Sequence, residues 1–114
     1  MLTLPITRTI TVEVIPFEGK NYVRTREIAS LLEIKQPFEF ASDIKKYNNT
    51  FILSEEDTEH IRTSTDRKNV TFIELNNLLE YLDTNTRLKH RANSILKDQL
   101  IIYLKKVKEV GKLL

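Results

Sequence analysis

The chain has 114 residues, 40% hydrophobic and 30% charged, a balance that predicts one domain with one modest core. It contains no cysteine, which excludes disulfide bonds, thiolate metal sites and a cysteine nucleophile. The formal net charge is only +2, but residues 1–60 carry 7 basic and 10 acidic side chains, whereas residues 61–114 carry 11 and 6.

The basic second half could follow a phosphate backbone, although solvated helix faces are often rich in lysine without any such partner. No apolar run approaches the roughly 18 residues that a membrane-spanning helix needs. The N-terminal segment also lacks the charged region and continuous apolar stretch of a secretory signal. We therefore expect a soluble, cytoplasmic protein with no membrane partner.

The first predicted elements are a β-hairpin and two short helices. Residues 8–15 alternate apolar and polar side chains, as a half-buried strand does, and residues 16–20 supply a turn before a second strand at residues 21–24. Thr25 is the expected N-cap of a helix over residues 26–33. Pro37 suits the first turn of a second helix that ends near Tyr47. These two helices predict a helix-turn-helix-like unit.

The second half predicts another hairpin followed by two more helices. Residues 54–57 are acidic and suggest an exposed loop. Residues 60–65 and 70–73 are rich in β-branched side chains and flank a polar tip at residues 66–69, which predicts the second hairpin. Leucines at positions 75, 78, 79 and 82 have helical spacing up to about residue 83. Residues 84–86 then cap a long last helix.

The last helix carries a heptad pattern. Apolar residues recur every 3.5 positions on average, with an asparagine one step upstream where a buried amide can fix the register of a coiled coil. The pattern predicts homodimerisation through residues 86–114, and its alternative is a long amphipathic helix packed on its own domain. The candidate dimerisation residues are Asn93, Leu96, Leu100, Tyr103, Val107 and Val110.

No pattern in the chain predicts catalysis. His60 and His90 have no metal-ligand or catalytic partners at the usual spacings, and only two glycines are present, so phosphate-binding glycine loops are absent. The acidic residues 55–59 lack the alternating ligands and the glycine of a calcium loop. We therefore expect a binding module and not an enzyme, with no catalytic residue, no cofactor, no metal and no small-molecule substrate.

Three clusters of polar and basic residues are candidates for DNA contact, because lysine and arginine hold phosphates and a two-stranded ribbon fits a major groove. The first is the predicted hairpin tip, the second opens the last helix, and the third lies on the second helix. Ordinary surface charge is the alternative for each of them. The residues are Arg62, Arg67, Lys68 and Asn69, then Arg87, Lys89 and Arg91, then Lys45 and Lys46.

The order of elements, together with some short sequence motifs, resembles a known family. Residues 10–14, then Gly19 to Val23, then the helix reading Glu-Ile-Ala-Ser-Leu-Leu at residues 27–32 are similar to the opening of Bro-N-type domains of phage antirepressors and large DNA viruses. Residues 70–78, where a strand leads into a helix, look like the second landmark of that family. The resemblance covers about residues 8–105 and implies a DNA-binding domain of viral regulatory type.

The combined expectation is a single α+β domain over residues 1–114, with two hairpins, short helices and a long amphipathic C-terminal helix. Its preferred partner is double-stranded DNA, bound by a homodimer that acts in transcriptional control. The alternative is a protein-interaction module, such as an antirepressor or inhibitor, that docks on a regulatory protein of a host or phage without binding DNA.

Overall fold

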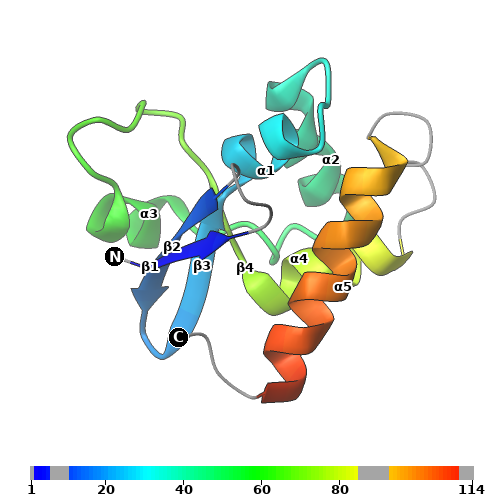
Figure 1. Ribbon diagram of the computed structural model, residues 1–114. Helices are drawn as coiled ribbons and strands as arrows, with labels where there is room; N and C mark the ends of the chain where they lie inside the picture. Colours follow the sequence, from blue (N-terminus) through cyan, green and yellow to red (C-terminus); the bar gives the residue numbers. More distant parts are fainter. Residues whose placement is uncertain (1, 6–10, 85–92, 111–114) are drawn as a thin grey trace.

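The computed structural model describes residues 2–5, 11–84 and 93–110, in which an antiparallel sheet and five helices form an α+β fold (Figure 1). The order of the elements is β1 (Leu2–Pro5), β2 (Thr11–Phe17), β3 (Lys20–Arg24), α1 (Thr25–Leu31), α2 (Pro37–Tyr47), α3 (Glu55–Ile61), β4 (Phe72–Glu74), α4 (Leu75–Thr84) and α5 (Ser94–Val110).

The sheet has the strand order β1-β2-β3-β4, and each strand is antiparallel to its neighbours. β1 pairs with the first part of β2, the last part of β2 pairs with β3, and β3 pairs with β4. The predicted hairpin of β2 and β3 is confirmed. Its turn residues Glu18 and Gly19 both have positive φ, the pattern of the tight turn whose twist matches the flanking strands.

Neighbouring strand residues are buried on opposite faces of the sheet. Val14, Val23 and Ile73 belong to the main core, whereas the adjacent Ile15, Tyr22 and Phe72 form a second cluster. Side chains of a strand alternate between faces, so burial of both neighbours means that both faces are covered. The second cluster packs against apolar side chains from β2, α3 and the segments on either side of that helix, namely Phe17, Leu53, Ile61 and Val70.

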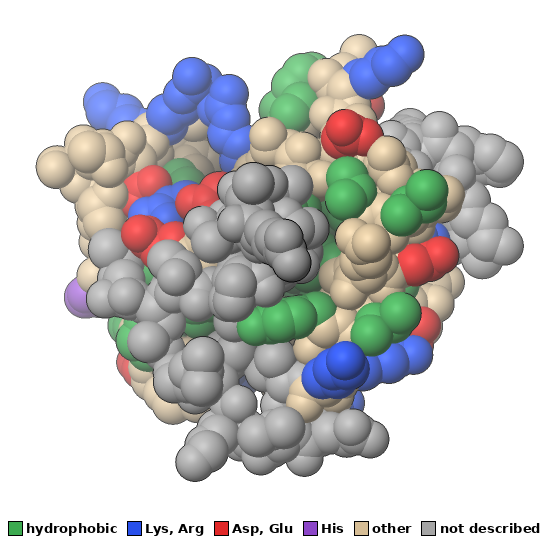
Figure 2. Space-filling view, in the orientation of Figure 1, with side chains coloured by type: hydrophobic (Ala, Val, Ile, Leu, Met, Phe, Trp, Pro, Cys, Tyr) green, Lys and Arg blue, Asp and Glu red, His purple; other side chains and the backbone are tan. Residues whose placement is uncertain are grey.

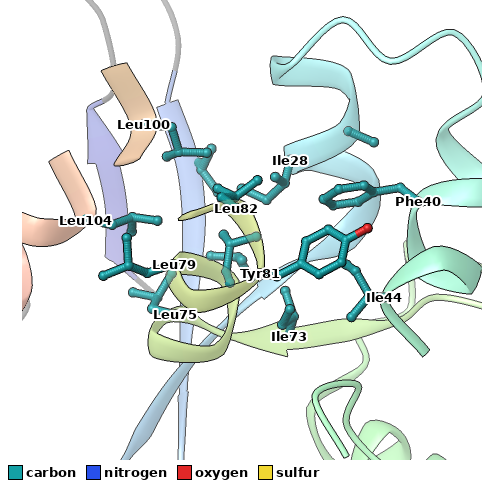
Figure 3. Close-up of a cluster of buried hydrophobic side chains, with 14 of the residues drawn as sticks. Ile28, Phe40, Ile44, Ile73, Leu75, Leu79, Tyr81, Leu82, Leu100 and Leu104 are labelled. Atoms are coloured by element: carbon teal, nitrogen blue, oxygen red, sulfur yellow. The ribbon is translucent and has the colours of Figure 1, made fainter. Parts of the chain in front are cut away.

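The main core lies where the sheet meets the helices. Figure 3 shows Tyr81 of α4 beside Phe40 and Ile44 of α2, with Leu100 and Leu104 of α5 closing the other side. The rings of Phe40 and Tyr81 meet edge to face with centroids 5.9 Å apart. The predicted leucine spacing of α4 is confirmed, since Leu75, Leu78, Leu79 and Leu82 are all buried, and this packing fixes how the helix is rotated.

The structure corrects the predicted start of α1. The helix begins at Thr25 itself, and Arg24 occupies the cap position without a side-chain cap bond. Thr25 is buried, and its hydroxyl is hydrogen-bonded to the side chain of Thr71. The Thr25 amide also donates to the carbonyl of Thr71 at 3.1 Å. Its side chain therefore joins two segments of the fold and does not cap the helix.

The predicted second hairpin is wrong, and so is the acidic loop before it. Residues 55–61 form α3, so His60 is helical, and β4 pairs with β3 and not with residues 60–65. The Ser54 hydroxyl accepts a hydrogen bond from the Asp57 amide at 3.2 Å, and three acidic side chains occupy the first turn. Negative charge at that end favours a helix. Residues 62–71 then form a loop.

The last helix differs from its prediction in both start and packing. As described, α5 begins at Ser94, and Asn93 caps it by accepting hydrogen bonds from the Ile95 and Leu96 amides, each at 3.1 Å. Of the predicted cap residues 84–86, Thr84 ends α4, and residues 85 and 86 lie outside the described residues. Figure 1 shows that α5 packs along α4. This is the packing expected from the alternative interpretation, in which the long last helix packs on its own domain.

Candidate nucleic-acid interface

The loop formed by residues 62–71 is held against the sheet by Arg24. The Nε and Nη2 atoms of Arg24 donate to the two carboxylate oxygens of Asp66, at 2.7 and 3.1 Å. Its Nη1 reaches Glu13 at 2.5 Å and Glu27 at 3.3 Å, and the guanidinium carbon lies 5.6 Å from the centre of the Phe72 ring. One guanidinium thereby joins β2, β3, α1 and the loop.

The charges of this cluster perturb each other strongly. The hydrogen bonds from Arg24 lower the pKa of Asp66 from 3.8 to about 2, against the opposing effect of burial, and bonds from the Thr63 amide and hydroxyl lower it further. The pKa of Arg24 is raised in turn, first by its hydrogen bond to Asp66. Arg24 and Asp66 are therefore both fully ionised at neutral pH.

An open groove of about 830 Å³ lies between this loop, α1 and α2. Three exposed basic side chains line it, and each comes from a different segment: Arg26 from α1, Lys45 from α2 and Arg67 from the loop. Asn69 of the loop and Phe38 of α2 line it as well. In Figure 2, blue Lys and Arg side chains gather at the upper left, over the loop region of Figure 1.

The electrostatic character of the groove follows from how its charges are paired. Its two carboxylates, Glu27 and Asp66, are both bound to Arg24. Within the described part of the chain, no carboxylate lies within 4 Å of the charged nitrogens of Arg26, Lys45 or Arg67. The groove thus presents three exposed cations whose charge is not neutralised by a described neighbour.

The acidic residues of α2 do not line this groove. Glu39 and Asp43 are absent from its walls, whereas Phe38, Ser42 and Lys45 of the same helix are present. With about 100° between successive residues, Glu39 and Asp43 lie roughly 100–140° around the helix from Phe38. Of the charged side chains of α2, the groove therefore receives Lys45, while Glu39, Asp43 and Lys46 lie away from it.

The predicted DNA contacts are only partly brought together. Arg67, Asn69 and Lys45 line the groove, and Lys68 is exposed beside them. Lys46 is exposed but does not line the groove, and Arg62 donates to Glu59 at 2.9 Å. The remaining predicted contacts lie outside the described residues: Arg87, Lys89 and Arg91.

The predicted dimerisation seam is occupied by the domain itself. Leu100 is 1% exposed in the main core, and Leu96 and Tyr103 pack against that core. The Asn93 side chain caps α5 and donates to Glu33 at 2.6 Å. These side chains are thus already engaged within one domain, and the homodimer stays a prediction. The side chains of Val107 and Val110 lie outside the description.

Sequence reasoning missed two groove residues, Arg26 and Phe38. The sequence did carry a signal for Phe38, because it lies about 200° around α2 from the core residue Phe40 and so faces away from the core. Arg26 gave no local signal, since its place beside Arg67 depends on the path of a loop about 40 positions later in the chain.

The described residues form neither a metal centre nor a membrane-spanning helix. In the described ranges, no three His, Asp or Glu side chains lie together in an arrangement suited to a metal ion. None of the described helices has both the length and the apolarity needed to cross a membrane. Comparison with protein-family models, curated proteins and solved structures finds no match to the chain. The resemblance to Bro-N-type domains therefore stays a prediction.

Proposed function

We propose that this chain is a cytoplasmic DNA-binding regulatory module and not an enzyme. The observation that supports this best is the convergence of Arg26, Lys45 and Arg67, from three separate segments, around one groove. Exposed cations without described carboxylate partners attract phosphates, and each one that neutralises a phosphate releases a counterion. Double-stranded DNA is the partner that we infer.

In this proposal α1 and α2 act as a helix-turn-helix-like unit. α2 turns the face that carries Lys45 toward the DNA, and the buried Phe40 and Ile44 on the opposite face hold it on the core. The loop supplies Arg67, Lys68 and Asn69 from the other side of the groove. Since Arg24 fixes that loop through two hydrogen bonds to Asp66, the two sides keep a defined spacing, which lowers the entropic cost of binding.

A gel-shift titration with duplex DNA of mixed sequence, at about 50–100 mM salt, tests the proposal. We expect a retarded complex with the intact chain, and much weaker retardation for a variant with Arg26→Ala, Lys45→Ala and Arg67→Ala. If the intact chain retards no duplex DNA under these conditions, the proposal is wrong.

A second candidate function is a protein-interaction module, including self-association as a homodimer. Two exposed side chains of α5 favour it: Ile95 is 68% exposed and Ile102 is 56% exposed. They are seven positions apart and so lie on the same, outward side of the helix. A nuclease-treated pull-down tests it: one stoichiometric protein partner, lost on Ile95→Asp with Ile102→Asp, would favour this function over DNA binding. Sedimentation analysis of the same variants distinguishes a homodimer from a different partner.

A further inference from the structure

α2 presents one continuous face to the groove. Phe38, Ser42 and Lys45 follow one another at spacings of four and three residues, and all three are exposed and line the groove. The half-buried Ala41 completes this face. Because the opposite side of the helix is locked into the main core by Phe40 and Ile44, the face cannot rotate away from the groove.

Phe38 is the unusual member of this face. Its side chain is 75% exposed, the highest value among the large hydrophobic side chains of the described residues. It directly follows Pro37, whose fixed φ angle holds the start of the helix. An exposed aromatic ring at the start of a helix, lining the same groove as Arg26, Lys45 and Arg67, suits a ligand that combines anionic groups with an apolar one.

Duplex DNA meets that description at one type of base. In the major groove, thymine alone presents an apolar group, its C5 methyl, among the donors and acceptors of the base edges. The two carboxylates of the protein groove are held by Arg24, which leaves the Phe38 ring, the Asn69 amide and several hydroxyls as the uncharged exposed groups available to bases.

We propose that Phe38 is a specificity-determining residue that packs on the C5 methyl of thymine, while Arg26, Lys45 and Arg67 hold the neighbouring phosphates. This inference rests on the proposed DNA-binding function. Phosphate contacts fix the position of the protein on the duplex but do not read sequence, so Phe38 supplies a base contact while those cations hold phosphates.

The test begins by selecting bound duplexes from a randomised pool with the intact chain, and then replaces each thymine of the selected site by deoxyuridine, which lacks only the methyl group. We expect one position at which this replacement weakens binding about fourfold, the effect of losing one buried methyl contact. Phe38→Ala should weaken binding to the thymine duplex and remove the sensitivity at that position. Phe38→Leu should retain it.

The matched control is Ile95→Ala, which removes a similarly exposed apolar side chain from α5. It should change neither the affinity for the thymine duplex nor the sensitivity of that affinity to deoxyuridine. If the intact chain binds with a steep salt dependence but deoxyuridine has no effect at any position, the role of Phe38 is refuted while the proposed function survives. That role is also refuted if Phe38→Ala mainly weakens the binding of single-stranded DNA, because the ring would then stack on unpaired bases. A failure of the intact chain to bind any duplex refutes both.

Discussion

Among single residues, Arg24 determines most directly where the loop of residues 62–71 lies. Its side chain is 13% exposed and that of Asp66 is 9% exposed, so the two groups interact largely out of water. A buried pair that is also fully hydrogen-bonded is costly to break by removing one member. The remaining carboxylates on Arg24, Glu13 and Glu27, keep it bound to the sheet and α1 even when the loop is released.

We expect Asp66→Asn to destabilise the fold at pH 7 by about 2 kcal/mol, the equivalent of the lowered pKa of the aspartate. The folded pKa of about 2 lies below the ordinary 3.8, so this contribution is present above about pH 4 and disappears as the pH falls toward 2. Urea unfolding at several pH values measures it, and the two proteins should converge near pH 2.

Asp98→Asn is the control for this prediction, because Asp98 is exposed on α5 and should change stability by less than about 0.5 kcal/mol at any pH. A constant difference between Asp66→Asn and the wild type from pH 7 to pH 2 would show that the ionised pair does not stabilise the loop.

At the level of elements, α3 shows how a short helix depends on its cap. The helix has only seven residues, and Ser54 provides its side-chain cap bond. We expect Ser54→Ala to cost about 1 kcal/mol of unfolding free energy, measured by chemical denaturation. Ser64→Ala, an exposed serine in the following loop, should be neutral. Equal effects of the two changes would contradict the assigned cap.

α5 gives a second test at this scale, because its two faces have different environments. Leu100→Ala should cost about 2–5 kcal/mol, since the side chain is buried between α5 and α4. Ile102→Ala, at an exposed position, should change stability by less than about 0.5 kcal/mol. If the heptad seam instead joined two chains, the effect of Leu100→Ala would depend on protein concentration.

Local patterns predicted the first hairpin, α2 and α4, because their apolar spacing agrees with the burial that tertiary packing produces. Local patterns failed at residues 54–61. The β-branched side chains from His60 onward suggested a strand, whereas the side-chain cap at Ser54 favours a helix. The heptad of α5 correctly indicated that Leu100 is buried, but spacing does not show which surface buries it, so the homodimer stays a prediction. The groove depends on Arg24 meeting Asp66 across 42 positions, which no local pattern contains.

At the scale of the whole molecule, one group of acidic side chains lies apart from the groove. Glu18, Asp57 and Glu74 lie near Tyr22, whose pKa is raised by burial and then by these three charges, and none of the three lines the groove. The basic groove lies between α1, α2 and the loop. If DNA binds at the groove as proposed, the field of the phosphate backbone attracts the groove and repels this acidic group, which raises the rate of association.

The salt dependence of DNA affinity tests most directly whether the groove is the DNA-contact surface. We predict that Arg26→Ala, Lys45→Ala and Arg67→Ala together reduce the slope of log affinity against log salt by about three phosphate contacts. Lys20→Ala, Lys106→Ala and Lys108→Ala remove the same charge from exposed positions elsewhere and should leave the slope nearly unchanged. Equal reductions in the two triple variants would contradict a defined interface at the groove.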